Sequence, residues 1–255
     1  MRPATPKLPP SFDRAAARYD LLNSLLSLGR DGAWRRALAR PLRPGERVLD
    51  LCCGSARSAV AAHARTRTTV VGVDLSAPML AGGRTHAAAR RAAFAPVRGD
   101  AFRLPFRDHA FDAVTVAWGL RNLVPERAAL AELRRVLRPG GRLHVLDSPS
   151  PPGGPVGAAH RAYLRGAVPL LGRLSADPAA YRYLAESVMA FGTVAEVAAR
   201  LAGADFACEP PEPLFGGAAA IWRARRPEAD PGTLRDATAA PGTGPCARGA
   251  AGGPA

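Results

Sequence analysis

The chain has 255 residues, of which 47% are hydrophobic, and its formal net charge is +14. This composition allows one full core, and the absence of any apolar run of about 18 residues excludes a membrane-spanning helix. Lys7 is the only lysine among 35 basic residues, and the arginines are dispersed without interleaved aromatic residues. That pattern argues against a nucleic-acid-binding surface, whereas a diffuse positive field favours weak contact with an anionic bilayer.

Cysteine spacing and the first residues bear on the cellular compartment. Cys52, Cys53, Cys208 and Cys246 have the spacing of neither a disulfide framework nor a zinc site, so no metal is expected. The stretch MRPATPKLPPSF contains no apolar segment of signal-peptide length. The sequence therefore predicts a cytoplasmic protein, with peripheral contact to the inner face of the membrane as a further hypothesis. A homodimer is left open.

The first half of the chain is predicted to contain two helical segments followed by alternating strands and helices. Residues 1–10 are predicted to be a flexible leader because of their four prolines, and residues 11–42 to form two helical segments broken near Gly29. From there, short apolar runs (RVLDLC, TTVVGVDL, FDAVTVAWG, GRLHVLD) alternate with Ala- and Arg-rich helical stretches. Such alternation predicts a mainly parallel sheet with helices on both faces.

The second half is expected to be more helical. Residues 149–160 are predicted to be a breaker-rich connection, followed by helical segments over 160–174 and 178–202. Two late runs, DFACEP and GGAAAIWRA, are expected to form an antiparallel hairpin at the sheet edge. We thus expect one domain over 11–226 with a helical lid near 155–190, and a disordered tail over 227–255.

Ligands of open α/β sheets bind at the carboxyl ends of the strands, so the residues that follow each strand are the candidates. The loop from Asp50 to Arg57 has small residues and precedes a helix, but its lone Gly54 fails the dinucleotide pattern G-x-G-x-x-G. Asp74, after the second run, suits the hydroxyls of a ribose. A helix cap formed by Asp74 or Ser76 is the alternative interpretation.

Two later segments extend this pattern. Asp100, in GDAFRLPF, can accept a hydrogen bond from an adenine amino group, and Arg121-Asn122, in AWGLRNL, place polar groups over the site. An ordinary polar turn and a surface loop are the respective alternatives. Together the positions favour an adenosyl ligand without a pyrophosphate. The sequence therefore predicts S-adenosylmethionine as the cofactor.

Several segments resemble the ubiquinone/menaquinone biosynthesis C-methyltransferase family of class I methyltransferases. They run in the family's order from about residue 12 to residue 225, and include VLDLCCGSA, GVDLSAPML and RPGGRL, which many methyltransferases share. The segments RYDLLNSLLSLG, GLRN and YRYLAES are more particular to the quinone enzymes. The resemblance implies a Rossmann-like class I methyltransferase fold whose mainly parallel sheet has seven strands, with an antiparallel edge hairpin.

The resemblance also implies roles for individual residues. The cofactor would be bound by residues of the strand ends, namely Asp50, Gly54, Ser55, Asp74, Leu75, Asp100, Ala101 and Ala117. Ser55 would contact the methionine part, Asp74 the ribose, and Asp100 with Ala101 the adenine. Arg121 and Asn122 would face the quinone ring. Tyr19, Tyr181 and Tyr183 would close over the substrate.

Three departures from the family pattern bear on affinity. Ala56-Arg57 stands where the family has Gly-Asp, Ala117 where it has serine, and Asp147 where it has glutamate. Ala56 is expected to be tolerated if its backbone has negative φ. Arg57 changes the charge at the start of the helix beside the cofactor.

The implied reaction is methyl transfer to a ring carbon of a quinol, demethylmenaquinol becoming menaquinol, in menaquinone or ubiquinone biosynthesis. Arg121 is a poor base because a guanidinium keeps its proton, so we expect it to stabilise a phenolate and to hold a water with Asn122, with Asp147 as a relay. A methyltransferase of a polyketide or other phenol is one alternative. A cofactor-defective binding protein on the same frame is the other.

Overall fold

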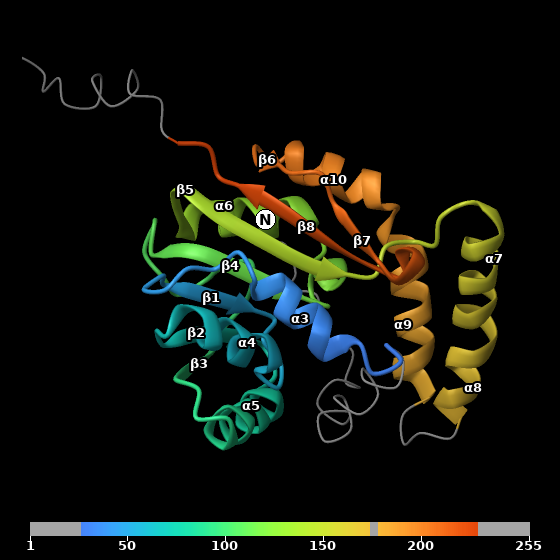
Figure 1. The fold of residues 1–255 in the computed structure, drawn as a ribbon, viewed down its shortest axis with the longest axis horizontal. Coiled ribbons are helices and arrows are strands. Elements are labelled where there is room, and N and C mark those ends of the chain that lie inside the picture. Colours follow the sequence, from blue (N-terminus) through green and yellow to red (C-terminus); the bar gives the residue numbers. More distant parts are fainter. Residues whose placement is uncertain (1–26, 174–177, 229–255) are drawn as a thin grey trace, which may run out of the picture.

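The computed structural model describes residues 27–173 and 178–228 (Figure 1). The expected leader, Tyr19 and nearly all of the expected tail lie outside these ranges. The described strands form one sheet in the order β3-β2-β1-β4-β5-β8-β6, with β7 also paired to β8. The strands are β1 (Val48–Leu51), β2 (Val70–Asp74), β3 (Phe94–Arg98), β4 (Phe111–Ala117), β5 (Leu137–Asp147), β6 (Ala207–Cys208), β7 (Glu212–Leu214) and β8 (Ala219–Arg225).

Strands β1 to β5 are parallel, and β8 lies antiparallel beside β5. Both β6 and β7 pair antiparallel with β8, along the edge that β5 leaves open. These two short strands therefore share the seventh position of the sheet. The Rossmann-like fold and its antiparallel edge are confirmed, although the outer strand is split in two.

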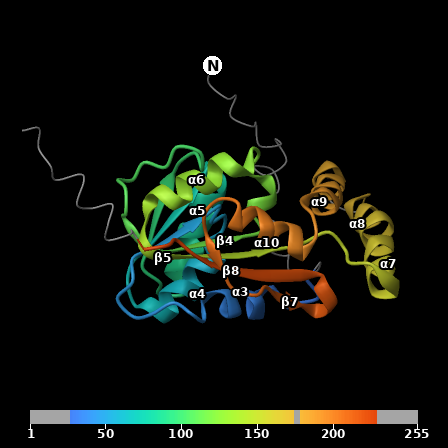
Figure 2. The ribbon, with the colours of Figure 1, turned by 90° about the horizontal axis from the view of Figure 1, so that it is seen from above.

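Helices cover both faces of the sheet. The helices are α3 (Asp31–Ala39), α4 (Arg57–Thr66), α5 (Ala77–Ala89), α6 (Glu126–Val136), α7 (Gly154–Ala162), α8 (Val168–Arg173), α9 (Pro178–Phe191) and α10 (Val194–Ala202). Helices α3 and α4 lie on one face, and α6 and α10 on the other (Figure 2). In the described ranges, no helix combines the length and apolarity needed to cross a bilayer.

Helices α7, α8 and α9 lie beyond the carboxyl ends of the parallel strands (Figure 1). Two expectations for this region are wrong. The connection expected over 149–160 already contains the start of α7 at Gly154, and the helix expected over 178–202 is two helices. The break falls at Gly192, whose φ is +99°, and Thr193 then caps α10 in a capping box with Glu196.

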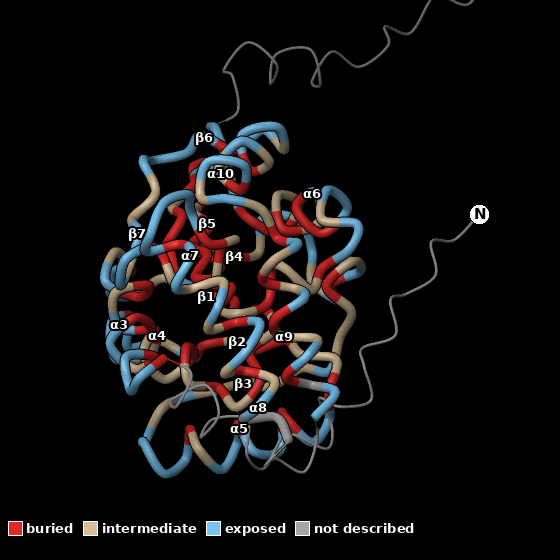
Figure 3. The backbone as a smooth tube through the Cα atoms, turned by 90° about the vertical axis from the view of Figure 1, so that its right-hand side faces the viewer, coloured by how far each residue is buried: buried red, intermediate tan, exposed pale blue. Residues whose placement is uncertain are grey.

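The largest core cluster lies between the sheet and the α6–α10 face. Buried residues run through the middle of the molecule (Figure 3). Helix α6 shows how the sequence specifies it, because Ala129, Leu130, Leu133 and Val136 recur at helical spacing and are all buried. Burial of each large apolar side chain contributes about 1.5–3 kcal/mol. This packing holds the carboxyl ends of the strands in register.

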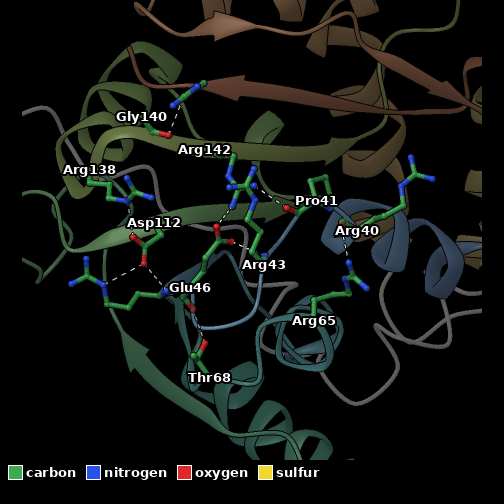
Figure 4. Close-up of polar contacts among 12 residues, drawn as sticks. Arg40, Pro41, Arg43, Glu46, Arg65, Thr68, Asp112, Arg138, Gly140 and Arg142 are labelled. Atoms are coloured by element: carbon green, nitrogen blue, oxygen red, sulfur yellow. Dashed lines mark hydrogen bonds and ion pairs between the residues drawn. The ribbon is translucent and has the colours of Figure 1, made fainter. Parts of the chain in front are cut away.

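At the opposite end of the sheet, arginines form hydrogen bonds and ion pairs that connect the segments where the strands begin (Figure 4). Asp112 accepts hydrogen bonds from the backbone N–H of Arg47 (2.8 Å) and from Nε of Arg138 (2.6 Å), and Arg142 pairs with Glu46. Part of the arginine excess therefore serves this network, on the edge away from the candidate site.

Candidate functional site

Asp74, the last residue of β2, joins the loop after β1 to the turn after β2. Its Oδ2 accepts a hydrogen bond from the backbone N–H of Gly54 (2.9 Å), and its Oδ1 accepts one from the N–H of Ser76 (2.9 Å). The hydroxyl of Ser76 accepts from the N–H of Met79 and caps α5. The helix cap is therefore Ser76, and the half-buried carboxylate of Asp74 lies at the carboxyl edge of the sheet.

The loop that follows β1 has three residues with left-handed backbone, Cys52, Gly54 and Ala56. Cys52 has a φ of +53° and Ala56 a φ of +62°, so the condition under which Ala56 was expected to be tolerated, a negative φ, is not met. The loop also packs closely against the end of β4, since a Cβ on Gly119 would lie 2.6 Å from the Cβ of Cys52. Burial, reinforced by Asp74, raises the pKa of Cys52 well above its ordinary value, so this thiol stays protonated.

Asp50 lies beneath this loop, inside the sheet. Its carboxylate is buried, and its Oδ1 accepts a hydrogen bond from the hydroxyl of Thr115 (2.8 Å) on the neighbouring strand. Its Oδ2 has no hydrogen-bond partner among the described residues. Burial raises the pKa of Asp50 from 3.8 to about 7, against the opposing effects of Thr115 and Arg35. The side chain thus links β1 to β4 inside the sheet, and its contact with the cofactor stays a prediction.

The remaining expected cofactor residues also lie at the strand ends. Oδ1 of Asp100 accepts a hydrogen bond from the N–H of Phe102 (3.0 Å), which orders the turn after β3, and Ala101 is buried in that turn. The carbonyl of Leu75 accepts from Nε of Arg98 (3.1 Å). Ser55 is half-buried in the loop after β1, and Ala117 ends β4.

The chemistry of this edge suits S-adenosylmethionine. Carboxylates at the ends of β2 and β3 accept hydrogen bonds from hydroxyls and amines, and they repel the phosphates of a dinucleotide. Asp74 and Asp100 therefore fit a ribose and an adenine, and the small residues of the loop allow close approach of backbone N–H groups.

Arg121 and Asp147 form a buried ion pair where β4 and β5 end. NH1 of Arg121 lies 2.5 Å from Oδ1 of Asp147, and the backbone N–H of Arg121 donates to Oδ2 (3.2 Å). The same guanidinium donates to the carbonyl of Trp118 (3.1 Å) and to the hydroxyl of Ser187 (3.3 Å) of α9. These contacts fix the direction of the guanidinium and link the sheet to the helices beyond it.

Asn122 and Tyr183 extend this polar cluster. The hydroxyl of Tyr183 donates to Oδ1 of Asn122 (2.9 Å), while Nδ2 of Asn122 donates to the carbonyl of Trp118 (3.3 Å). Burial raises the pKa of Tyr183 above its ordinary value of 10.0, so its hydroxyl donates at neutral pH. Four of the expected residues, Arg121, Asn122, Asp147 and Tyr183, are thus in direct or shared contact.

A cavity of about 290 Å³ adjoins this cluster. Most of its wall is apolar, and it comes from four regions of the fold: the start of α3, the segments after β4 and β5, the helices α7 to α9, and the segment before β8. Its lining includes Trp34, Trp118, Arg121, Tyr163, Leu184 and Phe215. An apolar chamber with one cationic side chain suits an aromatic ring that bears an oxygen anion.

Comparison with known proteins identifies the family. The family model described as the ubiE/COQ5 methyltransferase family matches residues 6–226. The chain belongs to this family. It is 45% identical over 219 residues to a demethylmenaquinone methyltransferase of Mycolicibacterium paratuberculosis, covering 85% of this chain and 92% of that one. A demethylmenaquinone methyltransferase of Thermus thermophilus is 46% identical over 221 residues, covering 85% of this chain and all of that one.

Solved structures share the fold at lower identity. A SAM-dependent methyltransferase from Thermotoga maritima superposes with a TM-score of 0.61 at 17% identity, covering 84% of this chain and 97% of that one. The [4+2]-cyclase SpnF gives a TM-score of 0.61 at 18% identity, covering 78% and 81%. Because a cyclase shares the fold, the fold alone does not specify methyl transfer. The family match makes this chain a SAM-dependent methyltransferase.

In this ubiE/COQ5 methyltransferase, the sequence pattern did not reveal Asp31, at the start of α3. Its buried carboxylate accepts hydrogen bonds from Nε of Arg35 (2.9 and 3.0 Å) and from the indole N–H of Trp118 (2.9 Å), and it pairs with NH1 of Arg57 (3.3 Å). The sequence offers only an acid in the first turn of a helix, which is a common feature of surface helices.

The expected substrate tyrosines differ in position. Tyr183 joins the polar cluster, whereas Tyr181 is buried with Leu164, Val168 and Val188 between α8 and α9. Neither tyrosine is among the described residues that line the cavity. Trp34 and Trp118, which do line it, were not predicted, and their rings lie 5.9 Å apart.

Proposed function

We propose that this methyltransferase transfers the methyl group of S-adenosylmethionine to a ring carbon of demethylmenaquinol. The observation that carries the proposal is the Arg121–Asp147 pair: Arg121 lines a mainly apolar cavity, and it follows β4, whose end packs against the loop after β1 at Gly119. The curated relatives named demethylmenaquinone methyltransferase support the choice of quinol.

When bound, S-adenosylmethionine supplies a methyl group on a positively charged sulfur, which leaves with the bonding electrons. A phenolate of the ring pushes electron density onto the neighbouring carbon, so that a carbon–methyl bond forms, and that carbon then loses its proton. Arg121 stabilises the phenolate because its guanidinium stays charged at any ordinary pH. Asp147 holds Arg121 and receives the ring proton through a water bound with Asn122.

Orientation is the second task of the cluster. Tyr183 anchors Asn122, and Ser187 and the carbonyl of Trp118 anchor Arg121, whose side chain lines the cavity. Alignment of the ring carbon with methyl and sulfur contributes several kcal/mol to a displacement of this kind. The indoles of Trp34 and Trp118 form the apolar surface against which the ring packs.

The proposal includes contact between the cavity mouth and a membrane surface. Three of the cavity-lining side chains, Leu28, Val156 and Phe215, are 50–65% exposed, and the guanidinium of Arg30 lies 4.4 Å above the Phe215 ring. Exposed apolar side chains beside arginines suit an anionic bilayer, in which the isoprenoid tail of a quinol resides.

The test is a pair of parallel assays with purified protein and S-adenosylmethionine. Demethylmenaquinol, kept reduced, should gain one methyl group by mass spectrometry, while short phenols should react far more slowly. Preferential methylation of the short phenols would contradict the proposed substrate. No methylation of either, together with no binding of the cofactor, would favour a cofactor-defective binding protein.

A further inference from the structure

Methyl transfer to a quinol ring requires a phenolate, so a base must remove the proton of one hydroxyl. Arg121 is no candidate, because a guanidinium is protonated at any ordinary pH. Asp147 is 0% exposed in its pair with Arg121 and is not among the described residues that line the cavity. A side-chain base for the hydroxyl therefore has to come from another part of the cavity wall.

His160, near the end of α7, has the chemistry for this task. Besides Arg121, the titratable side chains in the described lining of the cavity are those of His160 and Tyr163. Burial raises the pKa of Tyr163 above its ordinary value of 10.0, so its phenol keeps its proton. Burial lowers the pKa of His160 below its ordinary value of 6.5, so its imidazole is neutral at neutral pH. His160 can thus accept a proton where Arg121 and Tyr163 cannot.

Contacts between α7 and the segment after β5 fix the position of His160 beyond the sheet (Figure 1). A Cβ on Gly157 would lie 1.6 Å from the carbonyl oxygen of Pro152, so α7 packs directly against that backbone. NH1 of Arg161, the next residue after His160, donates to the same carbonyl (2.8 Å). In the part of the chain that the structure describes, nothing forms a hydrogen bond with the imidazole, so its ring nitrogens are left for a ligand.

The charges around the cavity suit the pair of ions that proton transfer creates. They come from three elements: Arg121, which is paired with Asp147, Arg30 above the Phe215 ring, and Arg161 on α7. These cations disfavour an imidazolium on its own. The phenolate that forms at the same time is an anion beside Arg121, and it compensates for the new positive charge.

We infer that His160 is the catalytic base that accepts the hydroxyl proton of the quinol. This inference rests on the proposed function, because it takes a quinol ring in the cavity as given. The O–H bond breaks as an N–H bond forms on the imidazole, and the electron pair of the oxygen moves into the ring. The ring carbon then bonds to the methyl group as the carbon–sulfur bond breaks. When that carbon has lost its own proton, the imidazolium returns a proton to the oxygen, and the ring is a quinol again.

The pH dependence of kcat in His160→Gln tests this assignment. At about pH 7.5, kcat for demethylmenaquinol should fall about a hundredfold or more, as expected for loss of a general base. With rising pH, kcat of the variant should then increase about tenfold per pH unit, because the quinol has to ionise without help and a phenol has a pKa of about 10. The unaltered protein should change far less, and KM for S-adenosylmethionine should be the same in both.

A second variant and a matched control complete the experiment. His160→Ala leaves room for free imidazole, which should raise its kcat at least about tenfold. His109→Gln alters an exposed histidine outside the described lining of the cavity, and should keep the kcat of the unaltered protein at every pH.

Three results would contradict the inference. A kcat of His160→Gln within about twofold of the unaltered protein would overturn it and leave the proposed function intact. An equal loss at every pH, without recovery of His160→Ala by imidazole, would overturn it in favour of a structural role for α7. Failure of the unaltered protein to methylate demethylmenaquinol would overturn the proposed function and the inference with it.

Discussion

The guanidinium of Arg121 and the carboxylate of Asp147 lie 2.5 Å apart, with side chains that are 6% and 0% exposed. Removal of one partner from such a pair leaves an uncompensated buried charge and costs about 3–5 kcal/mol of stability. Truncation of Arg121 therefore mixes a catalytic effect with a folding effect. A substitution that keeps the charge separates the two.

We expect Arg121→Lys to lower kcat by about a hundredfold while the protein stays folded. The ammonium keeps the charge beside Asp147 but cannot reproduce the three guanidinium contacts with Asp147, Trp118 and Ser187, so the cation is misplaced relative to the phenolate. Steady-state kinetics should show this loss with an unchanged affinity for S-adenosylhomocysteine. A variant with normal kcat would remove Arg121 from the catalytic scheme.

Tyr183→Phe tests the orientation of Asn122. The substitution deletes the hydroxyl that donates to Oδ1 of Asn122 at 2.9 Å. We expect kcat to fall about tenfold and the free energy of unfolding to fall by about 1 kcal/mol, the usual contribution of one hydrogen bond. Tyr181→Phe, in the same helix but packed in the apolar cluster between α8 and α9, is the comparison and should retain kcat. Equal activity of the two variants would count against the proposed role.

The cavity mouth should govern membrane binding. Replacement of Leu28, Val156 and Phe215 by Ser removes three exposed apolar side chains, each worth about 1–2 kcal/mol on insertion, so partitioning onto anionic vesicles should fall at least a hundredfold. Val124→Ser alters a side chain that is equally exposed but absent from the cavity lining, and should bind as before. Sedimentation with vesicles measures both, and undiminished binding of the triple variant would refute this docking face.

The sequence predicted the parts of the site that depend on local pattern. Each β-branched apolar run ended in an acid or a polar pair, and parallel strands bring such ends to one edge, which is why Asp74, Asp100 and Arg121 could be chosen. The sequence also contains a signal for the break between α9 and α10. Gly192 can end a helix, and Thr193, three residues before Glu196, can cap the next one. The break was missed because the apolar period continues across it.

Contacts between distant segments could not be predicted in this way. Asp31 and Trp118 are 87 residues apart, and only the docking of α3 against the end of β4 brings them together. His144, within β5, is buried: burial, with Arg142 and Arg223 nearby, lowers its pKa from 6.5 to about 3. The sequence shows that His144 lies in a strand but not which face of the sheet it meets.

Asp50 should make stability fall as pH rises. Its pKa is about 7 in the folded chain and near 3.8 when unfolded, so the folded state holds the proton more tightly. The stabilisation is full below pH 3.8, is lost as pH rises to about 7, and amounts to about 4 kcal/mol. Asp50→Asn, which stays neutral, should therefore unfold at higher urea than the unaltered protein at pH 8, and the difference should shrink to about a quarter at pH 4.5. The reverse order at pH 8 would contradict the burial argument.

Substitution of Ala56 compares the cost of its left-handed backbone with the stabilisation from its buried methyl group. A φ of +62° costs a residue with a Cβ about 1–2 kcal/mol, which Ala56→Gly would relieve. The same change removes a fully buried methyl group, which lowers stability by about 0.8 kcal/mol. It also raises the conformational entropy of the unfolded chain, which lowers stability by about 0.4–1 kcal/mol. These terms nearly cancel, so the free energy of unfolding should change by less than about 1 kcal/mol.

Ala56→Val adds bulk at the same backbone angle. A Cβ on Gly83 would lie only 3.3 Å from the Cβ of Ala56, so little space exists for a larger side chain there. Overpacking and the β-branched side chain at positive φ should together cost at least about 2 kcal/mol. Urea unfolding measures the stability of both variants. A large loss of stability in Ala56→Gly would mean that burial of the methyl group outweighs the backbone strain. An Ala56→Val variant as stable as the unaltered protein would mean that the loop moves away from Gly83.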